Sequence, residues 1–320
     1  MRLSSLNRQW LYDLATETFF RLTAATKRTQ RLTWNLPADV QRVVAVRWPS
    51  RYEWAPGAKW GDQILDALAR WVPVRREEIA QPYRGTVQCH FIVHDKSFPV
   101  AFNTSDYPDF LEPASVAETL VTFKAQFDAR GYGDDRIVAG GYLPSSTRLY
   151  SLLDHLRNLG AREPLYDVYG RFGLDATVGI RGEVLGELNR QTLFRYFGGD
   201  SLVRYSRYLQ QAARSKVCVD LPGRGPLCFR FVEYLAMGSC IVGWRQGIKF
   251  PGPLSDGVQH VAVDDTPTMI QQCAELLANG QRRRSLGDAA RQYFDTYLHR
   301  DQLGAYYIHV VLARCGVTSQ

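Results

Sequence analysis

The chain is poor in cysteine, poor in lysine and free of long apolar runs. Its 320 residues include six cysteines, which stand in separate apolar segments with no C-x-x-C pair and no Cys/His spacing that suits zinc. No uncharged run reaches the roughly 18 residues that a membrane-spanning helix needs. The first residues lack the basic end, apolar centre and cleavage site of a secretory signal. We therefore expect buried free thiols, no metal, no membrane span and a cytoplasmic location.

Two glycine-rich phosphate-binding patterns are also missing. The segment PGRGP (222–226) departs from G-x-G-x-x-G, because Cys228 stands where the third glycine would be. No Gly-Lys-Ser/Thr sequence follows it. A dehydrogenase and a kinase are therefore disfavoured.

Arginine supplies most of the positive charge. Of the 39 basic residues, 33 are arginine and six are lysine, and the net charge is +7. Guanidinium groups bind phosphate and carboxylate through paired hydrogen bonds, although a compositional preference for arginine would give the same count. Residues 1–84 carry 14 basic and 8 acidic side chains, a local +6, whereas the whole of 151–320 has +4. The N-terminal part is therefore the better candidate for a polyanionic partner.

Strand and helix signals alternate along the chain, which favours an α/β fold with parallel sheets covered on both faces. The expected strands are 41–48, 86–95, 98–106, 166–173, 215–221, 239–244 and 259–265, and the expected helices are 62–72, 115–131, 181–196, 201–214, 227–237 and 281–315. Lys124 is then an exposed residue of a helix. We expect two doubly wound, Rossmann-like domains that face a cleft, in 1–150 and 151–300, with a helix in 301–320 that packs back on the first domain.

The most informative stretch joins a buried strand, a glycine-rich loop, a helix and a second buried strand: SKVCVDLPGRGPLCFRFVEYLAMGSCIV (215–242). Gly223 and Gly225 let the loop approach a ligand closely, and the helix amides with Arg224 and Arg230 can surround a diphosphate. Glu233, one turn deeper, can accept hydrogen bonds from ribose hydroxyls. The alternative is a plain connecting turn and an Arg230–Glu233 pair within the helix.

This stretch resembles the donor-binding segment of nucleotide-sugar glycosyltransferases of the GT-B fold, in the group-1 and exostosin-like branches. Their pattern R-x-x-E-x-L-x-x-G-x-x-x-V is matched by Arg230, Glu233, Leu235, Gly238 and Val242. The segment YGRFG (169–173) is similar to the opening of the second domain in that family.

The resemblance implies a GT-B fold with an acceptor-side first domain and a nucleotide-sugar-binding second domain. It further implies that Glu233 binds the donor ribose and that Arg171 and Arg230 face its phosphates. The implied co-substrate is a nucleoside-diphosphate sugar, with a UDP-sugar as the expected donor, and the design requires no metal or other cofactor.

One departure concerns catalysis. Many retaining members carry two glutamates eight residues apart, and the earlier one falls at Gly225 in this chain. The stereochemistry therefore stays open, and an inverting enzyme needs a general base. Asp106, in a polar loop after a strand, is the preferred base, although aspartate before Tyr-Pro is also a common turn residue. His94 is the second catalytic candidate, because a histidine near a strand end touches the donor sugar in retaining relatives; a solvated strand-end histidine is the alternative.

These observations favour transfer of a sugar to a hydroxyl acceptor, most simply a saccharide. A first alternative is a phage-type DNA glycosyltransferase that acts on a hydroxymethylated base in double-stranded DNA, since the basic N-terminal part suits a polyanion. A second is a non-catalytic protein that binds nucleotides or nucleic acid. A loop with Trp48, Tyr52, Trp54 and Trp60 either stacks on sugars or bases or packs at a domain edge.

Overall fold

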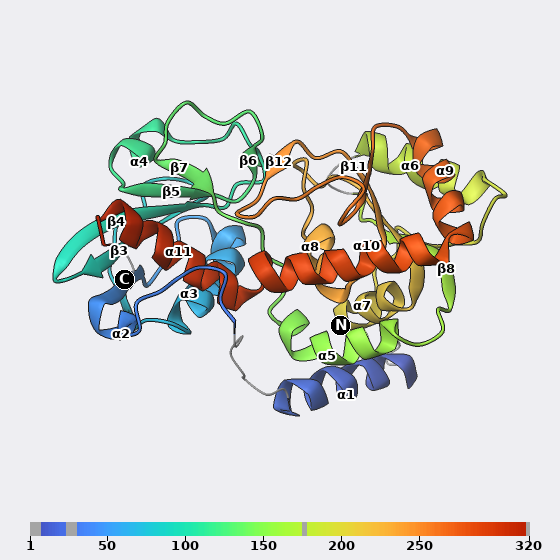
Figure 1. The fold of residues 1–320 in the computed structure, drawn as a ribbon, viewed down its shortest axis with the longest axis horizontal. Coiled ribbons are helices and arrows are strands. Elements are labelled where there is room, and N and C mark those ends of the chain that lie inside the picture. The colour runs from blue at the N-terminus through green and yellow to red at the C-terminus, as the bar shows by residue number, and fades with distance from the viewer. Residues whose placement is uncertain (1–7, 24–30, 175–177, 318–320) are drawn as a thin grey trace.

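Two β-sheets, one in each half of the chain, organise the fold (Figure 1). The computed structural model describes residues 8–23, 31–174 and 178–317. The first sheet has the order β2-β1-β3-β4-β5-β7 and the second the order β13-β11-β10-β8-β9. We call the first sheet with its covering helices the first lobe, and the second sheet with its covering helices the second lobe. The structure is therefore an α/β fold, as the alternating pattern predicts.

The first sheet is mixed. Its strands are β1 (Val44–Pro49), β2 (Val74–Glu77), β3 (Thr86–Val93), β4 (Lys96–Asn103), β5 (Val121–Lys124) and β7 (Ile137–Ala139). β3 runs antiparallel to both β1 and β4, whereas the other pairs are parallel. The expectation of an all-parallel first sheet is wrong, because only His94 and Asp95 join β3 to β4. A parallel connection needs a dozen residues or more, and a two-residue turn makes a hairpin.

The second sheet is parallel throughout. Its strands are β8 (Tyr166–Arg171), β9 (Tyr196–Gly199), β10 (Ser215–Asp220), β11 (Ile241–Trp244) and β13 (Val261–Val263). Numbered along the chain, the spatial order is 2-1-3-4-5. The next two strands along the chain, β9 and β10, therefore lie on opposite sides of β8. This reversal places a crevice outside the carboxyl ends of β8 and β10, which is where such sheets bind ligands.

Helices cover both faces of the second sheet because its side chains alternate. The helices of this lobe are α5 (Arg148–Gly160), α6 (Val178–Arg190), α7 (Tyr205–Ala213), α8 (Phe229–Met237), α9 (Thr266–Ala278) and α10 (Gly280–Tyr293), with α1 (Arg8–Thr23) outside α5 and α7. Val168, Val217 and Val219 pack with α6 and α9. Tyr169 and Cys218 point the other way, into the core shared with α7 and α8. Period-two alternation thus gives one strand two buried faces.

The segment 113–131 corrects a sequence prediction. It holds only the short helix α4 (Pro113–Ala117), then β5, then β6 (Phe127–Asp128), instead of one long helix. All four residues of β5 are buried, since the strand lies between β4 and β7. Lys124 is consequently fully buried rather than exposed. The expected helix 181–196 likewise ends at Arg190, and 196–199 forms β9.

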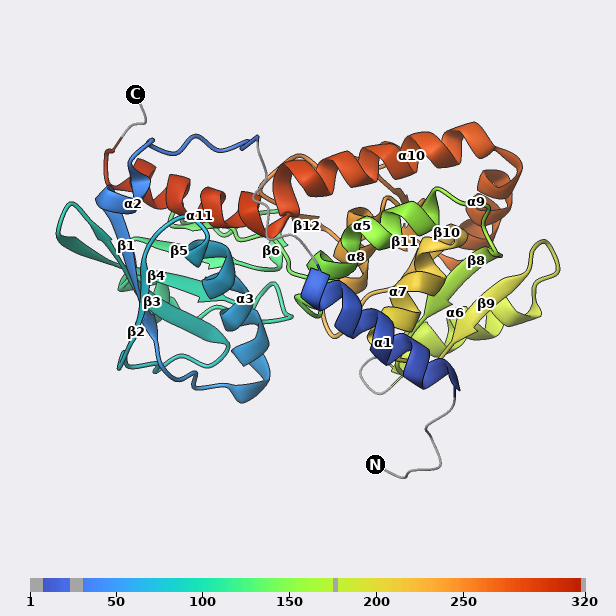
Figure 2. The same cartoon turned by 90° about the horizontal axis from the view of Figure 1, so that it is seen from below.

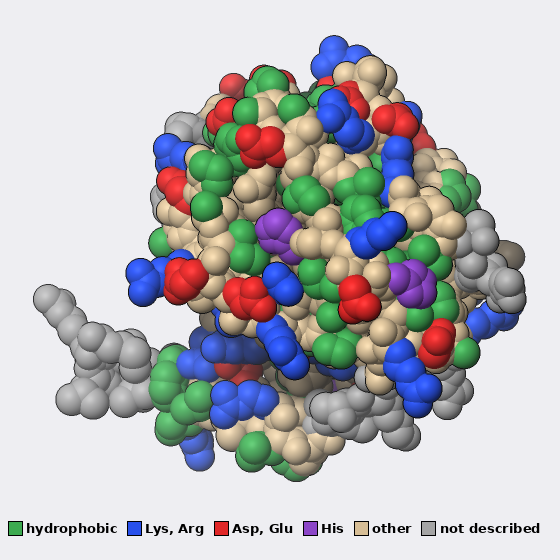
Figure 3. All heavy atoms as spheres, turned by 90° about the vertical axis from the view of Figure 1, so that its left-hand side faces the viewer, with side chains coloured by type: hydrophobic (Ala, Val, Ile, Leu, Met, Phe, Trp, Pro, Cys, Tyr) green, Lys and Arg blue, Asp and Glu red, His purple; other side chains and the backbone are tan. Residues whose placement is uncertain are grey.

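Charges of both signs are mixed over the surface of the first lobe. Figure 3 shows that end of the molecule, where acidic and basic side chains are interspersed. Several arginines of residues 1–84 are paired with acids: Arg76 with Asp62 at 2.6 Å, Arg47 with Glu77 at 3.7 Å, and Arg70 with Asp301. Acidic side chains thus neutralise part of the basic charge of this region, and on that face the two signs are interspersed.

The C-terminal helices connect the lobes (Figures 1 and 2). α10 runs along the second lobe, a π-helical turn η3 (Phe294–Leu298) follows, and α11 (Arg300–Arg314) lies on the first lobe beside α3 (Ala58–Ala69). Gly304 touches the Ala67 carbonyl so closely that a Cβ would not fit. The hydroxyls of Tyr306 and Tyr307 donate to the carbonyls of Ala139 and Gly140, each at 2.8 Å. α11 thus anchors the second half of the chain to the first sheet.

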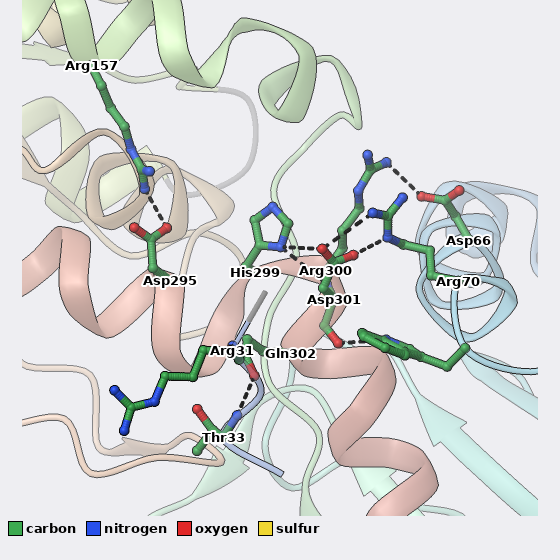
Figure 4. Close-up of polar contacts among 11 residues, drawn as sticks. Arg31, Thr33, Asp66, Arg70, Arg157, Asp295, His299, Arg300, Asp301 and Gln302 are labelled. Atoms are coloured by element: carbon green, nitrogen blue, oxygen red, sulfur yellow. Dashed lines mark hydrogen bonds and ion pairs between the residues drawn. The ribbon is translucent and has the colours of Figure 1, made fainter. Parts of the chain in front are cut away.

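Polar contacts fix the start of α11 (Figure 4). Asp301 is fully buried and pairs with Arg70, the residue after α3, while its carbonyl accepts from the Trp71 indole at 2.9 Å. Burial lowers the pKa of neighbouring His299 to about 4, so its ring is neutral at pH 7. A second contact joins the lobes, because β12 (Ile248–Lys249) pairs with β6. Remaining short elements are α2 (Val40–Val43) and the 3-10 turn η2 (Ala55–Gly57).

Candidate active site

A cavity of about 560 Å³ lies between the two lobes. The carboxyl end of β8 lines it through Arg171, and the loop after β10 lines it through Gly223 and Arg224. On the other side, the wall comes from the loops that follow β1 and β4. The cavity therefore occupies the crevice that the strand order predicts, and its size suits a nucleotide-sized molecule.

Guanidinium groups dominate the second-lobe wall. Arg230, in the first turn of α8, is 4% exposed, and its Nε donates to the Arg171 carbonyl at 3.3 Å. Its guanidinium stacks 4.6 Å from the centre of the Phe172 ring. Arg171 donates through Nη1 to the Ser201 carbonyl at 2.8 Å. Together with the exposed Arg224, these residues form the arginine group expected from the sequence.

Arg181 joins this group, and the sequence analysis missed it. It comes from α6, and it is held by the Pro222 carbonyl, 2.8 Å from Nε, and the Gly173 carbonyl, 2.6 Å from Nη1. Burial, together with the positive charge of Arg230, lowers the pKa of Arg181. The available signal was its place near the start of the helix that follows β8, the usual anion-binding position in a parallel sheet.

Asp220, the last residue of β10, is the counter-charge beneath these arginines. Its Oδ1 lies 3.8 Å from Arg230 Nη1 and has no hydrogen-bond partner. Burial raises the pKa of Asp220 to about 7. At neutral pH one partly ionised carboxyl therefore faces two buried guanidiniums, which leaves positive charge in excess at the cavity wall.

The loop between β10 and α8 is fastened to the first lobe. Gly225 lies against the Asp106 carbonyl and Gln126 Oε1, in a space that no Cβ could share. The Gln126 amide accepts from Leu227 N at 3.0 Å and donates to Leu227 O at 3.2 Å. Gly225 thus serves a contact between the lobes rather than a ligand contact, whereas Gly223 and Arg224 line the cavity.

Asp106 is placed in the cavity wall by the loop after β4. Tyr142 donates to its Oδ1 at 3.1 Å. Lys124 fixes the loop from below, because its Nζ donates to Asn103 Oδ1 at 2.9 Å and to the Tyr107 carbonyl at 2.8 Å. Burial lowers the pKa of Lys124 to about 8. Asp106 is thereby a half-buried carboxylate at the mouth between the lobes.

The sequence leaves two roles open for the aromatic residues between positions 48 and 60, ligand stacking or packing, and the structure divides them between the two. Trp54 and Trp60 line the cavity, and the Lys59 ammonium lies 4.3 Å from the centre of the Trp60 ring. Trp48 instead is fully buried in the first lobe, where its indole donates to the Tyr52 hydroxyl at 2.8 Å. One pair of aromatics is thus available to a ligand, and the other packs.

Glu233 does not reach the cavity, which corrects the expectation that it binds the donor ribose. Its side chain is 0% exposed. Oε1 accepts from Ser145 N at 3.0 Å, Ser145 Oγ at 2.9 Å and the Tyr205 hydroxyl at 2.8 Å. Ser145 and Tyr205 themselves line the cavity. Glu233 therefore holds two lining residues in place from one layer below, and burial raises its pKa.

His94 also lies away from the cavity. It forms the β3–β4 turn with Asp95, at φ values of 46° and 64°, the left-handed conformation of a two-residue hairpin turn. The turn stands at the opposite end of β4 from Asn103, roughly 24 Å away for eight extended residues. His94 is a strand-end residue as expected, but the strand end is on the wrong edge of the sheet for catalysis.

Within the described ranges, no three His, Cys, Asp or Glu side chains gather as metal ligands do. Nor does any helix in those ranges have the length and hydropathy needed to cross a membrane. No protein-family model and no curated protein matches the chain. Among solved structures, it is similar to a glycosyltransferase from Rickettsia africae ESF-5, with a TM-score of 0.39 and 11% identity over 99% of this chain and 85% of that one. A TM-score this low establishes neither a shared fold nor a shared function.

Proposed function

We propose that the protein is a glycosyltransferase that moves a sugar from a nucleoside-diphosphate sugar to a hydroxyl acceptor. The observation that carries the proposal is the excess of buried guanidinium charge at the carboxyl ends of β8 and β10, facing a cavity of about 560 Å³. The GT-B arrangement, with the donor in the second lobe and the acceptor against the first, is part of the proposal.

The arginine group suits the leaving diphosphate. Arg171, Arg181, Arg224 and Arg230 line one wall, and the amino end of α8 adds its amides and dipole. A diphosphate that departs with an extra negative charge is stabilised most where positive groups are already fixed and water is excluded. These groups supply that charge without a metal ion. A UDP-sugar is the proposed donor.

Asp106 is the proposed general base. The acceptor oxygen forms a bond to the anomeric carbon, the bond from that carbon to the diphosphate breaks, and the electron pair leaves with the diphosphate. The acceptor proton passes to Asp106. Direct attack of this kind inverts the anomeric configuration. Trp54, Trp60 and Tyr142 line the same side of the cavity, where their ring faces suit the apolar faces of a sugar.

A glycan acceptor is preferred to duplex DNA. Duplex binding needs an array of basic groups along the phosphate backbone. On the first-lobe face of Figure 3, acids are interspersed with the arginines, and Arg47, Arg70 and Arg76 are paired with acidic side chains.

The first experiment is a thermal-shift screen of nucleoside diphosphates and their sugars. A ligand present at 100 times its Kd adds about 2.7 kcal/mol to the free energy of unfolding. We expect a rise in Tm of several degrees for one nucleotide and its sugar. The absence of a shift with every nucleotide would contradict the proposed donor site.

The second experiment separates catalysis from binding. Asp106→Asn should lower the rate of nucleoside-diphosphate release by about 10²–10⁴-fold while the nucleotide-induced rise in Tm is kept. Asp109→Asn, in the exposed part of the same loop, is the matched control. Binding without release in any acceptor mixture would favour a non-catalytic nucleotide-binding protein.

A further inference from the structure

Helix α1 turns its two acidic side chains, Asp13 and Glu17, toward the second lobe, whereas a surface helix usually turns its charged residues to the solvent. Asp13 is buried. Glu17 Oε2 pairs at 2.9 Å with Arg204, the residue before α7. The same oxygen pairs at 3.2 Å with Arg148, the first residue of α5. α1 lies across α5 and α7 on the outside of the second lobe (Figure 2). Ion pairs therefore help to hold this helix to the second lobe, together with Phe20, which packs against the core and lies 4.5 Å from the His155 ring, centre to centre.

The opposite side of α1 is apolar and exposed. Leu11, Ala15, Phe19 and Leu22 follow one another at helical spacing, with Tyr12 beside them, and Leu22 is 76% exposed. We call these five residues the outer stripe. The exposed charged side chains of α1 are Arg8 and Arg21. The outward surface of α1 thus combines large apolar groups with positive charge and carries no exposed acid.

The inner side of α1 contacts the segment that leads to the cavity rim. Leu202 and Val203 line the cavity, and Leu202 is 93% exposed. The next residue, Arg204, pairs with Glu17 and lies 4.9 Å from the centre of the Trp10 ring on α1. Exposed apolar side chains therefore occur both on α1 and on the cavity rim beside it.

We propose that the outer stripe, with Arg8 and Arg21, binds the surface of an anionic lipid membrane. A helix that pairs an apolar face with arginines lies in the membrane interface and is attracted to anionic lipids. A second copy of the chain fits less well, because a two-fold contact through this face brings the arginines of one copy against those of the other. This inference stands on α1 and does not depend on the proposed transfer reaction.

The experiment is co-sedimentation of the full chain with vesicles. We expect binding to equimolar phosphatidylcholine and phosphatidylglycerol, and much weaker binding to phosphatidylcholine alone. The triple variant Leu11→Ser, Phe19→Ser, Leu22→Ser should lower partitioning about tenfold or more. Arg8→Gln with Arg21→Gln should lower it about fivefold for each charge removed, and added salt should weaken the wild type.

The matched control removes three exposed apolar side chains elsewhere: Leu165→Ser, Leu193→Ser and Val258→Ser. It should bind vesicles within about twofold of the wild type, because scattered surface residues do not form an insertion face. All variants should keep the wild-type Tm, since every altered side chain is exposed. Equal binding of stripe and control variants, or no binding of the wild type, would overturn the proposal. So would a wild-type dimer in light scattering that the stripe variant converts to a monomer.

Discussion

The two lobes contribute unlike walls to one cavity. The second lobe offers the ends of parallel strands, with Arg171 at the end of β8 and Asp220 at the end of β10, and it gathers buried guanidiniums around them. The first lobe offers loops, with Trp54, Trp60 and the half-buried Asp106. Positive charge is therefore concentrated on one side of the cavity, and the aromatic rings and the Asp106 carboxylate lie on the other.

This difference follows from sheet topology. In the parallel sheet every strand ends on the same edge, so consecutive strand–helix units bring their polar ends together. In the mixed sheet the β3–β4 hairpin reverses the chain, so its turn, with His94 and Asp95, goes to the far edge. Among the six strands of that sheet only β3 runs the other way, so its carboxyl end points away from the cavity, while the loops after β1 and β4 reach it.

The largest effect on the second-lobe wall is expected from Arg230→Ala. The variant removes a guanidinium held 4% exposed at the cavity, and charged hydrogen bonds to a buried anion are worth about 1.5–3 kcal/mol. Affinity for the nucleoside diphosphate should therefore fall about 100-fold, as measured by calorimetry. Arg190→Ala, whose side chain is exposed and paired with Glu187, is the control. Unchanged affinity in Arg230→Ala would remove the arginine group from the site.

The variant Gly225→Ala tests the contact between the two lobes. An alanine Cβ there would collide with the Asp106 carbonyl, so we expect Gly225→Ala to lower the free energy of unfolding by about 1–3 kcal/mol. Gly223→Ala is matched, because its Cβ would meet only ordinary contacts, the nearest at 3.4 Å from the Leu227 carbonyl. Chemical denaturation measures both. Equal stability of the two variants would show that the lobes do not touch at this loop.

A pH-dependent effect is expected from Asp220→Asn. Burial raises the pKa of Asp220 to about 7, so the folded chain binds a proton that the unfolded chain releases at about pH 4. Stability contributed by this group therefore falls as the pH rises from about 4 to about 7 and is level above that. At pH 8 the free energy of unfolding of Asp220→Asn should exceed that of the wild type by about 1–2 kcal/mol. At pH 5 the two should be equal, because the amide and the protonated carboxyl are both neutral polar groups that stay buried.

The control is Asp264→Asn, because Asp264 is exposed and paired with Arg245. This substitution should change the free energy of unfolding by the same amount at pH 5 and at pH 8. Nucleotide-sugar affinity of the wild type should also rise as the pH falls through 7, since protonated Asp220 no longer offsets Arg230. Asp220→Asn should lose that dependence. A wild-type affinity that is flat across pH 7 would contradict a role for Asp220 in the charge balance.

The smallest effect is expected from Glu233→Gln. The amide oxygen can still accept from Ser145 and Tyr205, so nucleotide affinity should change by less than about threefold, a fraction of one hydrogen bond. Glu233→Ala should instead destabilise the fold by about 1–3 kcal/mol, because it leaves buried donors unpaired. A large loss of affinity in Glu233→Gln, at wild-type stability, would restore a direct contact with the ligand.

Sequence patterns predicted the second lobe better than the first. The segment 215–242 folds as expected into β10, a loop, α8 and β11, because its apolar runs, glycines and helical spacing all favour one structure. The segment 115–131 was wrongly predicted as one helix, since VTFK is compatible with either state and only its burial between β4 and β7 makes it a strand. Local pattern is weak where tertiary neighbours decide the conformation.

The site shows the same division. Arg171, Arg224 and Arg230, which the sequence predicts from the loops that they flank, line the cavity. Arg181 was missed because its burial depends on contacts with Gly173 and Pro222. Glu233 does lie on the helix that the spacing predicts. Its depth below Ser145 and Tyr205 depends on α7 and on the loop before α5, which are distant in sequence.

By itself, the sequence determined that this chain is an α/β protein, where its glycine-rich loop lies, and that Arg224 stands in that loop with Arg230 soon after it, because backbone periodicity and residue chemistry act locally. The tertiary structure alone decided that Lys124 and Glu233 are buried, that His94 faces away, and that Asp106 touches Gly225 where the two lobes meet. Those facts depend on strand order and on the packing of α11 against the first sheet, and contacts between residues far apart along the chain leave no periodic trace in it.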